Sequence, residues 1–350
     1  MNNLPFRRLP PWLLRVALSA AILGAGFTAG WFVRGHREPP AGLPMHMIRD
    51  QGPAQWRFIN PLLECDEAEN VIQRPELVSF KRQIIDLVET RRAAGEIMFA
   101  SVYFRELNDG PWIGLNERIG YLPASLLKLP TLIAVLKRAE REPAFLARQV
   151  LFNGRRNENA IIVFPPAETL EPGHSYTVEE LCRRMVRFSD NNATGLLNDL
   201  VTMPEQDETL RGLGVLPELI GTRGKLNVKA VSSFLRVLYN ASYLSREHSE
   251  EALEMLSHSS FRDGVIGGVP GGVTVCSKYG KADLGDGIVQ LHEFAVVYHE
   301  RRPYLLGVMT QGRDFTALAR LIHDVSQTVY GEVDRQSHAA TGVDLPPAPR

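Results

Sequence analysis

The chain has 350 residues, of which 44% are hydrophobic and 23% charged, the proportions of an ordinary globular protein. Its formal net charge of −1 excludes a generally basic nucleic-acid binder and a strongly acidic chain. The three cysteines, Cys65, Cys182 and Cys276, are widely spaced and odd in number, which excludes a disulfide framework.

The first 35 residues predict a membrane anchor. An apolar stretch over residues 12–33 is broken only by Arg15, and about 20 such residues span a bilayer as a helix. Arg7 and Arg8 precede it, which orients the N-terminus toward the cytoplasm. The alternative is a signal peptide cleaved at the small residues 28–30. The anchor is favoured because the apolar run continues beyond them, and either alternative exports the rest of the chain.

The remainder divides into three regions. Residues 36–56 are rich in proline, glycine and charge without apolar periodicity, and predict a linker. Residues 57–333 contain no internal repeat or low-complexity break, which favours a single domain. Residues 334–350 have the composition of a disordered tail.

Within the domain, strands are expected at both ends and helices in the middle. A stripe of apolar residues at helical spacing predicts a first helix over 75–95. Strands are expected at 96–107, 111–116, 272–278, 287–300 and 303–311. Further helices are expected from Ser125 onward and at 177–188, 228–240, 246–258 and 314–330. This order predicts an α/β fold of the α+β type, with one antiparallel sheet formed by both ends of the domain and an all-helical lobe. Such lobes form clefts where they meet.

A serine and a lysine stand three residues apart in "YLPASLLKLPTLIAVL", an otherwise almost wholly apolar run. Ser125 and Lys128 share one helix face, so the amine lies within reach of the hydroxyl. A lysine with a lowered pKa activates a serine, and backbone N–H groups at a helix start stabilise an oxyanion. The alternative interpretation is a serine that caps the helix and a solvated lysine. Chance alone predicts about one Ser-x-x-Lys in a chain of this length.

Two further motifs follow in the chain. Ser189, Asp190 and Asn191 lie between two helical patterns, where a cluster of helix caps is the alternative interpretation. Lys278 and Gly280, in "VCSKYGKAD", end a β-rich segment and offer a cation and an accessible backbone to a carboxylate. A hairpin with a solvated lysine is the alternative there.

Ser-x-x-Lys, Ser-Asp-Asn and Lys-x-Gly in this order resemble the signature set of class A β-lactamases and penicillin-binding proteins. The likeness extends over roughly residues 58–330, and it implies a β-lactamase-like fold. It implies roles for the following residues: Ser125 as the acylated nucleophile, Lys128 as its proton partner, Ser189 as proton donor to the leaving nitrogen, Asn191 as the group that orients the substrate amide, Lys278 and Gly280 as carboxylate-binding elements, Asp190 as a structural residue, and the backbone N–H groups of Ser125 and Lys281 as the oxyanion hole.

Two departures from this family pattern affect the expected chemistry. The third motif usually has threonine or serine where this chain has Tyr279, which puts carboxylate binding in doubt. Ser277 does not replace that hydroxyl easily, because strand alternation points it away from Lys278. The family's Glu-x-x-Leu-Asn loop is also missing. Its nearest match, "RGKLN", places Arg223 at the glutamate position, and arginine cannot act as a base.

The expected function is therefore a serine hydrolase that acylates Ser125 with a β-lactam or a related D-alanyl amide of the cell wall. Deacylation is expected to be slow, with Glu218 as a possible substitute base. The alternative is a catalytically inactive wall-binding or sensor module of the same fold. The histidines, including His174, His258, His292 and His299, follow no ligand spacing, so no metal and no cofactor are expected. The catalytic domain is expected outside the cytoplasm, tethered to the membrane or secreted.

Overall fold

The computed structural model describes residues 47–49, 56–65, 75–108, 110–160, 166–218, 220 and 224–339. The expected anchor over 1–35 and most of the expected linker lie outside these residues. Within the described part of the chain, no helix combines the length and the apolar character needed to cross a membrane.

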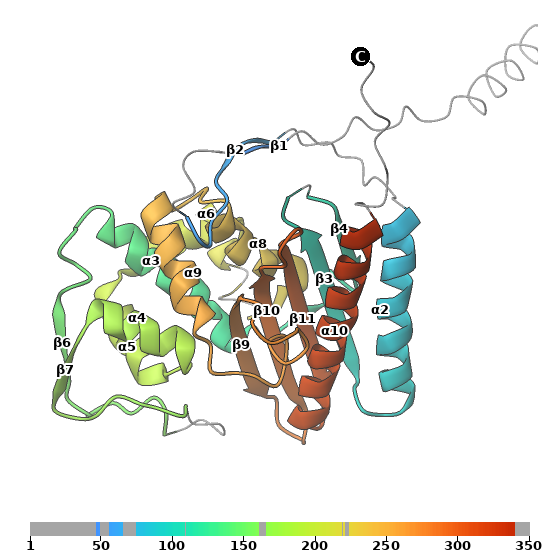
Figure 1. Ribbon diagram of the computed structural model, residues 1–350. Coiled ribbons are helices and arrows are strands. Elements are labelled where there is room, and N and C mark those ends of the chain that lie inside the picture. Colours follow the sequence, from blue (N-terminus) through green and yellow to red (C-terminus); the bar gives the residue numbers. More distant parts are fainter. Residues whose placement is uncertain are drawn as a thin grey trace, which may run out of the picture. The chain divides into compact units, whose positions relative to one another are not determined.

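A five-stranded antiparallel sheet lies at the centre of the described domain (Figure 1). Its strand order is β4-β3-β11-β10-β9, so the pairing of β3 with β11 joins the two ends of the domain. The strands are β3 (Phe99–Glu106), β4 (Trp112–Leu115), β9 (Val275–Asp283), β10 (Val289–Val297) and β11 (Tyr304–Gly312). This confirms the expected sheet built from both termini.

Two long helices, α2 (Pro75–Ala93) and α10 (Phe315–Ala339), lie side by side on one face of the sheet (Figure 1). The apolar stripe predicted for the first helix is buried here, since Phe80 and Ile84 are each 1% exposed. They pack with Leu318 of α10 and with alternate residues of the central strands.

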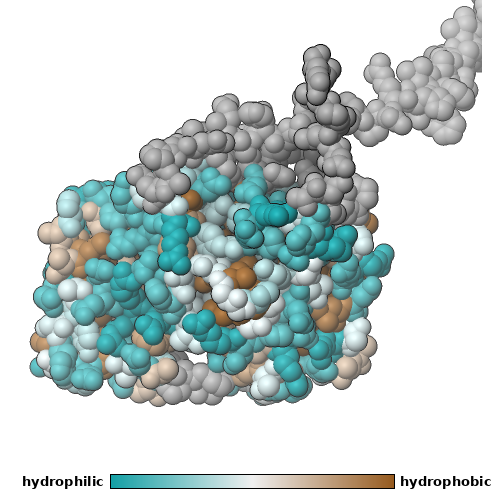
Figure 2. All heavy atoms as spheres, viewed as in Figure 1, coloured by the Kyte–Doolittle hydropathy of each residue, from teal (hydrophilic) through white to brown (hydrophobic). Residues whose placement is uncertain are grey.

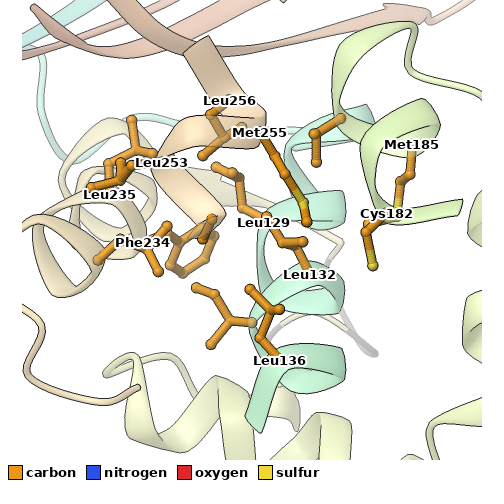
Figure 3. Packing of buried hydrophobic residues seen from close by; sticks show 14 of the residues in the cluster. Leu129, Leu132, Leu136, Cys182, Met185, Phe234, Leu235, Leu253, Met255 and Leu256 are labelled. Atoms are coloured by element: carbon orange, nitrogen blue, oxygen red, sulfur yellow. The ribbon is translucent and has the colours of Figure 1, made fainter. Parts of the chain in front are cut away.

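The other face of the sheet carries the all-helical lobe. Its helices are α3 (Lys128–Ala139), α4 (Val178–Arg187), α5 (Asn191–Leu200), α6 (Met203–Gly212), α8 (Val228–Tyr239) and α9 (Arg246–Ser257). Apolar side chains from α3, α4, α8 and α9 meet in one cluster (Figure 3). Cys182 and Cys276 are buried free cysteines, and they pack as small hydrophobic residues. The face shown in Figure 2 is mostly hydrophilic, with apolar residues in small scattered patches.

Several short elements position the active-site region. The 3₁₀ helix η1 (Ala124–Leu127) leads directly into α3, and β5 (Gly120–Tyr121) pairs with β8 (Leu226–Asn227) just before it. A separate hairpin joins β6 (Gln149–Phe152) and β7 (His174–Thr177). The sequence analysis did not predict these strands, because segments of two to four residues carry too little alternation to be recognised.

The structure corrects two expected boundaries. Residues 47–49 form β1 (Met47–Arg49), which pairs with β2 (Leu62–Cys65), so the expected linker over 36–56 contains a strand. Helix α10 continues to Ala339, so the expected tail over 334–350 is wrong for its first residues. The reason is that buried positions continue at helical spacing, with Val333 and Ser337 each 4% exposed.

Candidate active site

The segment that leads to Ser125 is held by the central strands of the sheet. The backbone N–H of Leu122 donates to Gln290 Oε1 over 3.1 Å, and its carbonyl accepts from His292 Nε2 over 3.0 Å. His292 Nδ1 accepts the Thr310 N–H, so the neutral ring carries its hydrogen on Nε2. Burial lowers the pKa of His292 to about 4, which keeps this arrangement in place.

Ser125 lies in η1, where the edge strand β9 approaches its backbone. A Cβ atom at Gly280 would lie 3.0 Å from the Pro123 carbonyl oxygen and 3.2 Å from the Ser125 nitrogen, so a larger residue would require these backbone atoms to move. The residue before the serine, Ala124, has φ +49°. This left-handed conformation is costly for alanine, and such strain is typical of functional sites.

Lys128 is 4% exposed, and its amine contacts the turn that begins at Ser189. It donates to the Ser189 carbonyl over 2.6 Å, to Ser189 Oγ over 3.1 Å and to Asn191 Oδ1 over 2.5 Å. These three acceptors use all three donors of an ammonium group. Ser125 Oγ forms no hydrogen bond with Lys128 or another described residue, so the reach expected from their spacing is not a direct bond here. Burial lowers the pKa of Lys128 to about 7, against the opposing effect of Asp190.

The Ser189–Asn191 turn is held by buried polar groups. Asp190 is fully buried and caps α5, accepting from the backbone N–H groups of Asn192 and Ala193. It also accepts from Asn159 Nδ2 over 2.8 Å. These contacts support the structural role expected of Asp190, while Ser189 adopts φ +59° and directs its hydroxyl toward the two lysines of the site.

Lys278 is fully buried on β9 and also contacts Ser189. Its amine donates to Ser189 Oγ over 3.1 Å and to the Tyr279 carbonyl over 2.8 Å. The Ser189 hydroxyl therefore lies between two amines. Burial, reinforced by the positive charge of Lys128, lowers the pKa of Lys278 well below its ordinary value, with Glu293 acting in the opposite direction.

A cavity of about 560 Å³ adjoins these groups. Ser125, Lys128, Asn191 and Lys281 line it, so residues from η1, α3, α5 and β9 meet there, whereas Ser189, Lys278 and Gly280 are not among its described lining residues. Its described lining residues are Ala124, Ser125, Leu127, Lys128, Pro130, Thr131, Asn191, Thr194, Asn198, Met203, Gln206, Asp207, Leu210, Pro217, Ile220 and Lys281.

Tyr279 changes the surroundings of Lys278. Its ring stacks on Phe261 with the centroids 4.7 Å apart, and the Lys278 amine lies 4.4 Å from the centroid of the Tyr279 ring. The ring thus covers one side of the amine. Ser277 is fully buried and falls on the same strand face as Tyr279, as alternation predicts. Lys278 was expected to contact a substrate carboxylate, but its amine is not exposed in this conformation.

The next residues to place are those considered as substitutes for the missing Glu-x-x-Leu-Asn loop. Glu218 has a 65% exposed side chain, pairs with Arg211 over 3.0 Å, and is not among the described residues that line the cavity. Its own backbone N–H and the Arg211 guanidinium lower its pKa, which weakens it as a base. Asn227 caps α8 by accepting the Ala230 N–H. Arg223 lies outside the described residues.

Sequence reasoning missed four contributors to this site. Lys281 lines the cavity, and its amine lies 5.6 Å from the centroid of the Phe261 ring, a contact that the sequence did not predict. Gln290 and His292 hold the segment that leads to Ser125, and Asn159 holds the turn through Asp190 and the Asn191 N–H. Each belongs to an element distant in sequence from the motif it supports, so no local pattern reveals it.

Solved structures share this fold at low sequence identity. A beta-lactamase from Chitinophaga pinensis DSM 2588 matches with a TM-score of 0.62 and 17% identity, over 73% of this chain and 99% of that one. A beta lactamase from Xanthomonas campestris pv. campestris gives a TM-score of 0.60 and 20% identity, over 73% and 97%. A mutant of PBP-A, solved as an acyl-enzyme complex with penicillin G, matches with a TM-score of 0.61 and 20% identity, over 74% of this chain and 97% of that one.

These likenesses establish the fold, and none of the curated proteins matches the chain. The family assignment comes from a sequence model described as the beta-lactamase enzyme family, which matches residues 79–333. This range includes all three motifs and every element from α2 to the greater part of α10. The chain therefore belongs to the beta-lactamase enzyme family.

Proposed function

We propose that the chain is a serine hydrolase that forms an acyl-enzyme on Ser125 with a β-lactam or a related D-alanyl amide of the cell wall. The observation that carries this proposal is the position of the Ser189 hydroxyl, 3.1 Å from the amines of both Lys128 and Lys278. Lys128 also lines the same cavity as Ser125, which supports its assignment as the base.

The proposed acylation proceeds in two proton transfers. Neutral Lys128 takes the proton of Ser125 Oγ, and the oxygen attacks the carbonyl carbon of the substrate. The backbone N–H groups of Ser125 and Lys281 stabilise the negative charge that develops on the carbonyl oxygen. The C–N bond then breaks as Ser189 delivers its proton to the leaving nitrogen, and the proton on Lys128 replaces it. A lysine with a pKa of about 7 suits both transfers near neutral pH.

Substrate positioning follows from the other lining residues. Asn191 accepts from Lys128 through Oδ1, which leaves its Nδ2 group for a substrate carbonyl. Lys281 lines the cavity together with Ser125, and in the proposed function it attracts the substrate carboxylate. Lys278 contributes through its hydrogen bond to Ser189.

Deacylation is proposed to be slow. A β-lactam ester needs a water molecule held and activated by a base. Asp207 is the only carboxylate among the described residues that line the cavity, and it lies on α6. Loss of a general base typically lowers a rate by about 10²–10⁴-fold. We expect rapid labelling of the enzyme and little turnover.

Intact-mass spectrometry after incubation with penicillin G tests the proposal. The full-length protein should gain the mass of one penicillin, and Ser125→Ala should gain none. Ser175→Ala, on exposed strand β7, is the control and should be labelled like the wild type. No adduct on the wild type would indicate an inactive binding module, and fast nitrocefin turnover would contradict slow deacylation.

We also propose that the catalytic domain is exported and held at the membrane by residues 1–35. The length of the apolar stretch over 12–33 and the arginines before it support this location.

A further inference from the structure

Helix α6 presents one face to the cavity. Met203, Gln206, Asp207 and Leu210 all line it. Their spacing of three, four and seven residues from Met203 places them on the same side of a helix. No residue of the three motifs belongs to α6, and the proposed acylation chemistry does not use this face.

Asp207 is the charged residue of this face. Helix α6 carries three carboxylates, and two of them have cations: Glu205 pairs with Arg138 over 3.7 Å and Glu208 with Arg141 over 3.6 Å. Asp207 has no ion pair or hydrogen bond with any residue in the described ranges. Asp207 thus lines the cavity, and no cation among the described residues pairs with its carboxylate.

The cavity wall thus carries charges of both signs. Two basic residues, Lys128 and Lys281, line the walls formed by α3 and β9, while Asp207 supplies negative charge on the wall formed by α6. The rest of the lining is uncharged and largely apolar, with amide and hydroxyl groups from Thr131, Thr194, Asn198 and Gln206. A complementary ligand has an anionic group near the nucleophile and a cationic group directed toward α6.

We propose that the α6 face is a subsite for an ammonium group on the acyl side chain of the substrate, with Asp207 as its counter-ion. The inference rests on the proposed acylation of Ser125 and narrows its substrate class. The favoured acyl donors are β-lactams or D-alanyl peptides whose side chain ends in a primary amine several bonds from the acyl carbon. The amide groups of Asn198 and Gln206 orient the chain that leads to this amine.

A matched pair of penicillins tests the subsite. One carries a 5-aminopentanoyl side chain and the other a hexanoyl side chain, so they differ only in a terminal ammonium in place of a methyl group. The second-order rate constant of acylation is measured for the full-length protein by intact mass. We expect the amine probe to react about tenfold faster, the size of one charge-assisted hydrogen bond. The ratio of the two rate constants, that of the amine probe divided by that of the hexanoyl probe, should fall at high salt.

Two variants decide whether Asp207 causes the preference. Asp207→Asn should bring the ratio close to one, and Glu208→Gln, the neighbouring carboxylate that pairs with Arg141, should leave the ratio unchanged. Asp207→Lys should instead favour a penicillin with an adipoyl side chain, whose end is a carboxylate. Thermal unfolding of each variant identifies any loss of fold.

The outcomes separate this inference from the proposed function. Equal rates for both probes on the wild type, or a preference that survives in both Asp207 variants, would overturn the subsite. A longer-lived acyl-enzyme in Asp207→Asn with an unchanged ratio would also overturn it and make Asp207 a hydrolytic base. If neither probe labels Ser125, the acylation proposal itself fails, and the subsite fails with it.

Discussion

The proposed chemistry depends on the amine of Lys128. As an ammonium it satisfies two oxygens of Ser189 and one of Asn191. A neutral amine has only two hydrogens and a lone pair, so one of these partners must then become the donor. The Ser189 carbonyl and the Asn191 oxygen have no hydrogen to give, whereas the Ser189 hydroxyl has one. Deprotonation of Lys128 therefore reverses the bond to Ser189 or frees the lone pair for Ser125.

Acylation should depend on pH through Lys128. Burial lowers its pKa to about 7 in the folded protein, so the neutral, basic form predominates above that value. The acylation rate constant for penicillin G should therefore rise with pH from 5 to 8 and level off above. Lys128→Arg keeps the positive charge but cannot lose its proton, and should lose at least 10²-fold in rate. A flat profile for the wild type, measured by intact mass at each pH, would contradict this assignment.

At the scale of elements, the sheet and most long helices were predictable because their apolar periodicity extends over many residues. The strand alternation of β9, β10 and β11 and the stripe of α2 are of this kind. Helix α6 was not predicted, since its sequence "MPEQDETLRG" is polar apart from its ends and buries little. The end of α10 was placed too early because its last turns alternate between buried and charged residues.

The site was predictable only to the level of proximity. Motif order correctly predicted that Ser125, Lys128, Ser189 and Lys278 come together. Which atoms touch depends on rotamers and burial that the fold sets, and no local spacing encodes them. The full burial of Lys278 and the turn of the Lys128 amine toward Ser189 are results of this kind.

The approach of β9 to η1 gives a prediction about Gly280. A methyl group there would press on two backbone atoms, the Pro123 oxygen at 3.0 Å and the Ser125 nitrogen at 3.2 Å, and neither yields as a flexible side chain does. Gly280→Ala should lower the acylation rate about tenfold or more by displacing the oxyanion-binding N–H of Ser125. The rate is measured with penicillin G.

Gly271→Ala is the matched control, because a Cβ at that position meets no atom within 4 Å. It should acylate at the wild-type rate. A Gly280→Ala protein that matches this control in both rate and thermal stability would show that the close approach has no part in catalysis.

At the scale of the whole molecule, both ends of the domain contribute strands to the sheet, and the helical lobe lies between them in the sequence. Residues 116–274 separate β4 from β9, and the lobe that they form supplies the Ser125 and Ser189 motifs. Lys278 comes from the returning strand, so the site is complete only when the two ends of the domain have paired.

The proposed anchor is tested by the location of the full-length protein in cells. An arginine at the centre of a membrane-spanning helix costs about 2.5–3.5 kcal/mol, so Leu23→Arg should move much of the protein out of the membrane fraction. Leu23→Ile keeps the apolar run and should remain with the membranes. Protease added outside the cytoplasmic membrane should digest the catalytic domain of the wild type. A mature protein whose mass shows cleavage near residues 28–30 would contradict the retained anchor and leave export as the function of this segment.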